Sequence, residues 1–159
     1  MSLNNLLSLR IACDGEGGSG KSTAARLISK DIGKFIDELP VLFIIAALTK
    51  GVSKFKNIGD LKNKESNRLL ESKKILVKAG IKCKITKDTM VIHGKDKIET
   101  RNKSILTKTK GDHRICMSSA ILALVTGIRT KIKNFETANT SFPGFIPLIK
   151  NLGGKIVIK

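Results

Sequence analysis

The chain has 159 residues, of which 41% are hydrophobic and 27% charged, and its formal net charge is +17. This length suits a single domain with a real hydrophobic core, and no apolar run reaches the roughly 18 residues that a membrane-spanning helix needs. The positive charge is mostly lysine spread along the chain, and there is no Trp or Tyr for stacking on bases. We therefore expect small anionic ligands as partners, with nucleic acid unlikely and no membrane contact.

The three cysteines, Cys13, Cys83 and Cys116, lie far apart and form no CxxC or Cys/His pairing. Such spacing predicts neither a zinc site nor a disulfide framework, so we expect reduced thiols and no metal. The apolar stretch at 6–11 is too short for a secretory signal. A cytoplasmic protein is the expectation.

The first predicted elements are a strand at 9–13 and a helix beginning at Ser22, with a glycine-rich loop of the form GxxxxGK[ST] between them. In such loops backbone N–H groups turn toward phosphate, the lysine reaches the terminal phosphates and the Ser or Thr can hold magnesium. The loop therefore predicts a nucleotide site, with ATP and magnesium as possible ligands. Its residues are Gly15, Gly17, Gly18, Ser19, Gly20, Lys21, Ser22 and Thr23.

The remainder of the chain contains two copies of the order helix–strand–helix–strand, about 76 residues apart, the separation of Gly51 and Gly127. In each copy an apolar helix ends at one of these glycines and an alternating strand follows, at 52–58 or 128–135. The second helix of each copy ends at Gly80 or Gly153, before a predicted strand at 81–85 or 155–158. Such a repeat indicates an α/β fold with internal pseudo-symmetry.

Between the copies, residues 89–93 alternate and should form a hairpin with 82–86 through the turn at 87–88. Residues 95–105 are polar and form another strand or a loop. Residues 112–124 then read as a helix that starts at Asp112. The strand at 9–13 should pair into the sheet, because an exposed sheet edge is costly, and the helix at 22–32 should cover its face.

Ionisable residues gather where predicted helices begin. Asp37 precedes a helix with Pro40 in its first turn, and Lys64, Glu65 and Arg68 fit one helical turn. Two arginines and a lysine near helix N-termini suit a carboxylate or phosphate, and acids with a histidine suit proton transfer. Taken singly, a Lys-Glu-x-x-Arg cluster is usually a solvated helix face, and an Asp before Pro is usually a helix cap. The residues are Asp37, Lys64, Glu65, Arg68, Asp112, His113 and Arg114.

Two resemblances organise these motifs. Residues 9–34, and the run 11–23 most clearly, resemble the start of cytidylate kinase and related nucleoside monophosphate kinases; nothing after Lys34 resembles their acceptor site or lid. IDELP at 36–40, KNKESNR at 62–68, GDHR at 111–114 and SFPGF at 141–145 resemble the 5-enolpyruvylshikimate-3-phosphate synthase family. The second resemblance implies a lobe built from repeated βαβαββ units, here incomplete, within an α/β fold.

The second resemblance also implies a reaction, the transfer of the enolpyruvyl group of phosphoenolpyruvate to shikimate 3-phosphate, with no metal or cofactor. It implies three catalytic residues: Asp37 at the shikimate hydroxyl, Glu65 at the enolpyruvyl carbon, and His113 beside the arginines that hold phosphoenolpyruvate. The substrate-binding residues that it implies are Lys64, Arg68, Arg114 and Asp60. Lys64, Arg68 and Arg114 should converge on one anion.

The resemblance to the synthase family covers only the end of the family's sequence, and its amino-terminal lobe has no counterpart here. We therefore divide the chain into a loop-bearing segment, 1–35, and a lobe-like segment, 36–159, within one structural domain. The chain should not turn over alone and would need a complementing lobe or a homo-oligomer. The alternatives are a nucleotide-binding module of the cytidylate kinase type and a non-catalytic fusion fragment.

Overall fold

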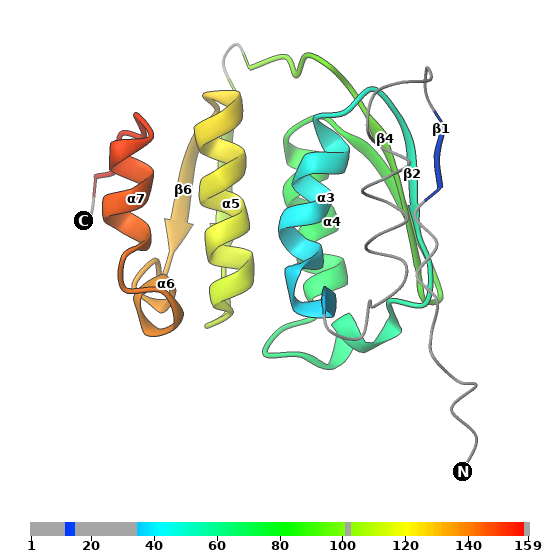
Figure 1. The fold of residues 1–159 in the computed structure, drawn as a ribbon, viewed down its shortest axis with the longest axis horizontal. Coiled ribbons are helices and arrows are strands. Elements are labelled where there is room, and N and C mark those ends of the chain that lie inside the picture. The colour runs from blue at the N-terminus through cyan, green and yellow to red at the C-terminus, as the bar shows by residue number, and fades with distance from the viewer. Residues whose placement is uncertain (1–11, 15–34, 101–102, 158–159) are drawn as a thin grey trace.

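The structure is a computed structural model that describes residues 12–14, 35–100 and 103–157 (Figure 1). Its helices and strands alternate along the chain, as the repeat predicts, and form a mixed α/β fold. In order they are β1 (Ala12–Asp14), η1 (Ile36–Glu38), α3 (Leu39–Ala47), β2 (Gly51–Phe55), η2 (Gly59–Asn63), α4 (Arg68–Lys78), β3 (Lys82–Thr86), β4 (Thr89–Gly94), β5 (Ser104–Lys108), α5 (His113–Thr126), β6 (Arg129–Lys133), α6 (Thr137–Ser141) and α7 (Phe145–Asn151).

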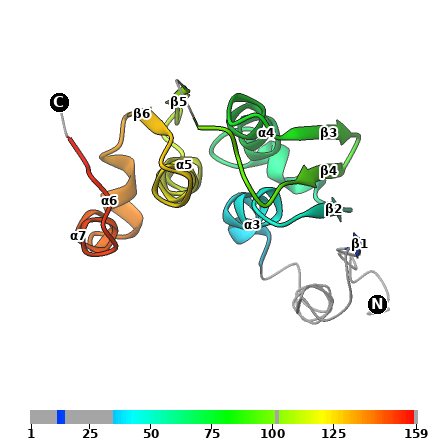
Figure 2. The same ribbon diagram turned by 90° about the horizontal axis from the view of Figure 1, so that it is seen from above.

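The first sheet has four antiparallel strands in the order β1-β2-β4-β3. Its inner face is apolar because alternate residues point to it: Phe55 from β2, and Met90 and Ile92 from β4, are buried. The helices α3 and α4 lie on this one side of the sheet (Figures 1 and 2). The hairpin predicted between 82–86 and 89–93 is confirmed, with Lys87 at a positive φ of 40° in its turn.

The second sheet is a parallel pair, β5 and β6, whose register runs from Ser104 opposite Arg129 to Lys108 opposite Lys133. The connection between the two strands is α5, as parallel strands require. Asp112 caps this helix, and Gly127 ends it with a left-handed φ of 71°. α6 and α7 follow β6 and pack on α5 (Figure 1).

The hydrophobic core has two parts. The larger lies between the first sheet and the helices α3, α4 and α5, where Phe43 and Phe55 meet edge to face with ring centroids 4.8 Å apart. The smaller lies around Cys116, Phe145 and Ile149, between α5, α6 and α7. Each fully buried Leu, Ile or Phe side chain stabilises the fold by roughly 1.5–3 kcal/mol. The burial of α3 and α5 in this core explains why the sequence of both helices is apolar.

Two predictions from the amino-acid sequence concern the ends of the chain; one is wrong and the other is confirmed in part. Residues 155–157 are described and form no strand, so the strand predicted at 155–158 is wrong for those residues. At the other end, Ala12–Asp14 pairs antiparallel with β2, which confirms the predicted pairing for residues 12 and 13. Residues 9–11, the predicted helix at 22–32 and the glycine-rich loop at 15–22 lie outside the described residues.

Candidate functional site

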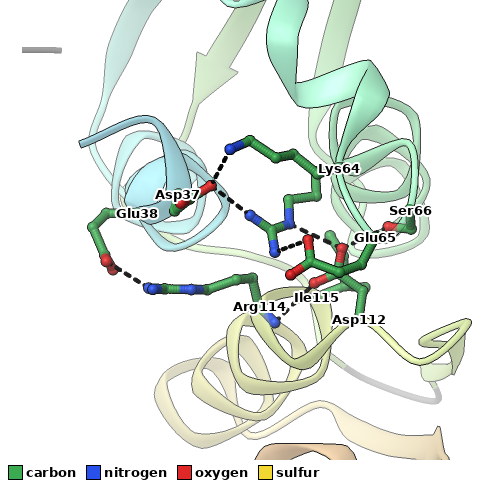
Figure 3. A network of polar contacts seen from close by, with 9 residues as sticks. Asp37, Glu38, Lys64, Glu65, Ser66, Asp112, Arg114 and Ile115 are labelled. Atoms are coloured by element: carbon green, nitrogen blue, oxygen red, sulfur yellow. Dashed lines mark hydrogen bonds and ion pairs between the residues drawn. The ribbon is translucent and has the colours of Figure 1, made fainter. Parts of the chain in front are cut away.

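Three segments that are distant in the sequence meet at one end of α3 and α4: η1, the stretch 64–68, and the first turn of α5 (Figure 3). Two caps fix the helix starts there. The Asn67 side chain accepts the Leu70 N–H at 2.9 Å to start α4, and Asp112 accepts the Arg114 N–H at 2.9 Å to start α5. Arg68 and Arg114 are therefore held in the first turns of two helices, where the helix dipole favours anions.

Arg68 is the centre of the network, and only 1% of its surface is exposed. Each of its three nitrogens donates to a different carboxylate: Nε to Asp112 at 2.9 Å, Nη1 to Asp37 at 2.8 Å and Nη2 to Glu65 at 2.5 Å. A guanidinium buried this deeply requires charged partners of this kind. In this arrangement every nitrogen of Arg68 is already engaged.

Asp112 is fully buried and joins Arg68 to α5. One of its carboxylate oxygens accepts from Ser66 Oγ at 2.8 Å and from Arg68 Nε, while the other caps α5. Because a single carboxylate accepts from both segments, the position of Arg68 and the start of α5 depend on each other.

Asp37 and Lys64 form the solvent-facing part of the network. Lys64 Nζ lies 2.9 Å from Asp37 Oδ1, the same oxygen that accepts from Arg68. The hydrogen bond from Lys64 holds the pKa of Asp37 below its usual range, against the opposing effect of partial burial, and the charges of Lys64, Arg68 and Arg114 add to this. Asp37 is thus an ionised carboxylate at neutral pH.

Arg114 differs from Arg68 in having donors to spare. Its Nη1 donates to Glu38 Oε1 at 2.5 Å, and its Nε is buried without a hydrogen-bond partner among the described residues. An unpaired buried donor is costly, and a guanidinium carries five N–H groups arranged for bidentate contact with carboxylate or phosphate. Among the three cations of the network, Arg114 is the one best placed to accept an added anion.

The structure corrects one expectation about this site and adds one feature to it. Lys64 is not in a helical turn with Arg68, because Lys64 has extended backbone angles and α4 begins only at Arg68. The two side chains converge all the same, on Asp37. In addition, the cations are not free: four carboxylates, Asp37, Glu38, Glu65 and Asp112, surround the three cations. An incoming anion must displace exposed carboxylates before it can pair with Lys64 or Arg68, whereas Arg114 keeps a donor that has no partner among the described residues.

The remaining predicted site residues lie at or beyond the edge of this network. His113 is the half-buried first residue of α5, Asp60 is exposed in η2, and neither takes part in the ion pairs that join the network among the described residues. The SFPGF motif serves packing: Phe145 is buried, with its ring centroid 6.4 Å from that of Phe135 and 6.0 Å from that of Phe142.

Two participants were missed as site residues by the sequence reasoning: Glu38 and Ser66. Both lie inside the quoted motifs, at 36–40 and 62–68. Their roles depend on pairings across 76 and 46 residues of chain, which no local pattern encodes.

In the described part of the chain, no group of His, Cys, Asp and Glu side chains could hold a metal ion. Cys83 and Cys116 are free thiols, and burial raises the pKa of Cys116 to about 11, so that thiol is protonated and unreactive at neutral pH. No helix within the described ranges is long and apolar enough to cross a membrane.

The arrangement can be compared with known proteins. Residues 14–149 match the model of the family described as EPSP synthase (3-phosphoshikimate 1-carboxyvinyltransferase). The chain belongs to this family. The matched range includes the glycine-rich loop, and the boundary at 35/36 stays a prediction.

Similar proteins and structures agree with this assignment. The 3-phosphoshikimate 1-carboxyvinyltransferase of Campylobacter jejuni subsp. doylei is 40% identical over 129 residues, which are 81% of this chain and 29% of that protein. The same enzyme of Paramagnetospirillum magneticum is 33% identical over 121 residues, 76% of this chain and 27% of that protein. An EPSP synthase structure from Acinetobacter baumannii superposes with a TM-score of 0.63 at 35% identity, covering 74% of this chain and 27% of that one. The chain thus spans little more than a quarter of the length of its relatives.

Proposed function

We propose that the network around Arg68 is one half of an enolpyruvyl transfer site, which acts on phosphoenolpyruvate and shikimate 3-phosphate only together with a complementing lobe. The observation that carries this proposal is the convergence of Asp37, Lys64, Glu65, Arg68 and Arg114 from three separate segments. A chain that spans about a quarter of the family enzymes would supply only part of their substrate contacts.

The proposed roles follow from charge and exposure. Arg114, which has unpaired donors, binds the phosphate or carboxylate of phosphoenolpyruvate. Asp37 is ionised and exposed, so it accepts the proton of the attacking hydroxyl, and Glu65 gives and removes the proton at the enolpyruvyl carbon. Arg68 stays buried and fixes both carboxylates in place. Phosphate then leaves, and neither metal nor cofactor takes part.

His113 and Asp60 have secondary roles in this proposal. His113 lies at the start of α5, one residue before Arg114, and would contact substrate beside it. Asp60 would reach the site only when the second lobe or substrate approaches η2. A cytoplasmic location is part of the same proposal, since its substrates are soluble anionic metabolites.

Titration of the full chain with phosphoenolpyruvate tests the proposal, with binding followed by NMR of the arginine side chains. We expect a dissociation constant on the order of millimolar, because half the donors are absent. Arg114→Ala should weaken binding roughly tenfold by removing a bidentate contact, whereas Lys64→Ala should weaken it less and in a more salt-dependent way. Arg129→Ala on β6 is the matched control. An equal loss of affinity in the Arg114 and Arg129 variants would show that the effect comes from the lower net positive charge and not from a contact of Arg114.

A second candidate function, nucleotide binding by the loop at 15–22, is supported by the loop's sequence and by the strand β1, which ends at Asp14 directly before it. A strand preceding a phosphate-binding loop is the context that its mechanism requires. This proposal predicts micromolar binding of ATP with magnesium, lost in Lys21→Ala. Calorimetry that gives no heat at millimolar nucleotide would dispose of it.

A further inference from the structure

A pocket of about 260 Å³ lies between α4 and β5 (Figure 2). The described residues that line it are different residues from those of the network around Arg68. Sites for small organic molecules usually measure roughly 300–1,000 Å³, so a pocket of this size suits a small ligand. We call it the α4–β5 pocket.

The α4–β5 pocket is strongly basic. Four lysines and one glutamate line it, which gives it a formal charge of +3, and the lysines are Lys74, Lys78, Lys108 and Lys110. Glu71 Oε1 lies 2.9 Å from Lys74 Nζ and 3.0 Å from Lys110 Nζ. Burial opposes the ionisation of Glu71, yet the hydrogen bonds from these two lysines hold its pKa below the ordinary value. One ionised carboxylate thus holds two ammonium groups side by side and leaves the pocket with an excess of positive charge.

The lysines keep hydrogen-bond donors for a ligand. An ammonium has three N–H groups. Lys74 and Lys110 each direct one of them to Glu71, and Lys78 donates one to the Leu106 carbonyl at 2.6 Å. A carbonyl group accepts a hydrogen bond but does not neutralise the charge of Lys78. The pocket therefore offers both donors and charge to an anion.

A buried hydroxyl also lines the pocket. Thr107 is 3% exposed, and its Oγ1 has no hydrogen-bond partner among the described residues. A buried hydroxyl without a partner costs free energy, so folding alone does not account for a threonine at this position. A ligand that accepts a hydrogen bond in the pocket would supply the partner that Thr107 lacks.

The chemistry of these groups favours a phosphate ester as the ligand. Lysine binds phosphate as a point charge, and a phosphate monoester carries close to two negative charges at neutral pH. A carboxylate carries one charge and would balance less of the excess. Ile75 and Leu106 add an apolar part to the lining, and Leu106 is 40% exposed. A small carbon skeleton that covers these side chains would remove apolar surface from water.

We propose that the α4–β5 pocket binds a small phosphate monoester, whose phosphate lies among the four lysines and accepts a hydrogen bond from Thr107 Oγ1. The carbon skeleton of the ester contacts Ile75 and Leu106. Glu71 is a positioning residue, because it holds Lys74 and Lys110 beside the phosphate. This inference does not depend on the proposed reaction, because it uses other residues.

Titration of the full chain with phenyl phosphate at constant ionic strength tests the proposal, with NMR of the backbone amides at 106–110 as the measurement. We expect these amides to shift with a dissociation constant on the order of 1 mM or below. Benzoate has the same ring and one negative charge, so it should bind roughly tenfold more weakly. The shifts at 106–110 should persist in Arg114→Ala. Equal affinities for the two probes would overturn the proposal, as would phenyl phosphate binding that leaves 106–110 unchanged.

Thr107→Val separates ligand binding from folding. The variant replaces a hydroxyl that has no partner with a methyl group of similar size, so the melting temperature should stay the same or rise. The affinity for phenyl phosphate should fall roughly three- to tenfold, because the hydrogen bond to the phosphate is lost. A lower melting temperature would show that the hydroxyl already has a partner, and an unchanged affinity would show that it does not reach the ligand; either result contradicts the proposal.

A pair of double variants tests the role of the lysines. Lys108→Gln with Lys110→Gln should lower the affinity for phenyl phosphate at least roughly tenfold, because two charged donors are lost. Lys82→Gln with Lys84→Gln on β3 removes the same charge from exposed positions outside the pocket and should change the affinity less than about twofold. Equal losses in the two double variants would show that net charge alone attracts the ligand, which would overturn the proposed site.

Discussion

At the residue scale, the network around Arg68 is defined by burial. Arg68 and Asp112 are almost completely removed from solvent and lie 2.9 Å apart, while Asp37 and Glu65 remain close to half exposed at 43% and 49%. The buried pair therefore holds the geometry, and the exposed carboxylates remain available for chemistry. Removing one member of a buried ion pair leaves an uncompensated charge, which is far more costly than losing an exposed pair.

Arg68→Ala should accordingly lower the free energy of unfolding by about 3–5 kcal/mol, because Asp112 is left buried without a cation. Arg68→Lys keeps the charge but loses the three-way fork, so a smaller loss of roughly 1–3 kcal/mol is expected. Urea unfolding measures both. Arg129→Ala, at an exposed arginine, is the control and should change stability by less than about 0.5 kcal/mol. Equal losses in all three variants would contradict the buried role of Arg68.

The pKa of Asp37 gives a second prediction at this scale. Its pKa in the folded chain lies below the ordinary 3.8, chiefly because of Lys64. The stabilisation from this carboxylate is therefore complete above pH 3.8 and is lost as the pH falls through the lowered value in the folded state. Lys64→Ala should raise the pKa of Asp37 and reduce this acid dependence, which NMR titration of the carboxyl carbon measures. An unchanged pKa of Asp37 in that variant would show that Lys64 is not the main cause of the lowered pKa.

At the element scale, the junction of β4 with α3 is the tightest contact involving a described glycine. A Cβ built on Gly94 would overlap the carbonyl oxygens of Ala46 and Thr49, and both of these are backbone atoms. The contact is held by a hydrogen bond from the Lys95 N–H to the Ala47 carbonyl at 3.0 Å. The end of the first sheet is thus fixed directly against the end of α3.

Gly94→Ala should therefore destabilise the chain by about 3 kcal/mol or more, because backbone must move to admit the methyl group. Gly59→Ala is the matched control: its Cβ would make an ordinary 3.5 Å contact with Asp88. Thermal unfolding of the two variants gives the comparison. Equal melting temperatures would show that the junction is looser than described.

The elements that the sequence predicted are those with local causes. The helices α3, α5 and α7 have apolar runs and stop signals, and the β3–β4 hairpin has alternation and a short turn. The tail at 155–157 has the same alternation yet forms no strand, because alternation alone does not supply the neighbouring strand that a strand must pair with. The same holds for the site. The motifs indicated Asp37, Arg68 and Arg114, but most of the carboxylates that pair with the two arginines come from segments distant in the sequence.

At the scale of the whole molecule, two features bear on the proposed half-site. It spans little more than a quarter of the length of its relatives, and its cations are paired with its own carboxylates. Both features fit the proposal that a complementing lobe is needed for function, and phosphate release tests that proposal.

The central measurement is the rate of phosphate release from phosphoenolpyruvate and shikimate 3-phosphate, by the purified chain alone and mixed with the remaining portion of the Campylobacter jejuni relative. We expect no release above the blank for the chain alone, release in the mixture, and loss of that release in mixtures with Glu65→Gln. The Lys84→Glu chain, altered away from the site, should retain it. Robust turnover by the chain alone would contradict the account, as would a mixture whose turnover is indifferent to Glu65.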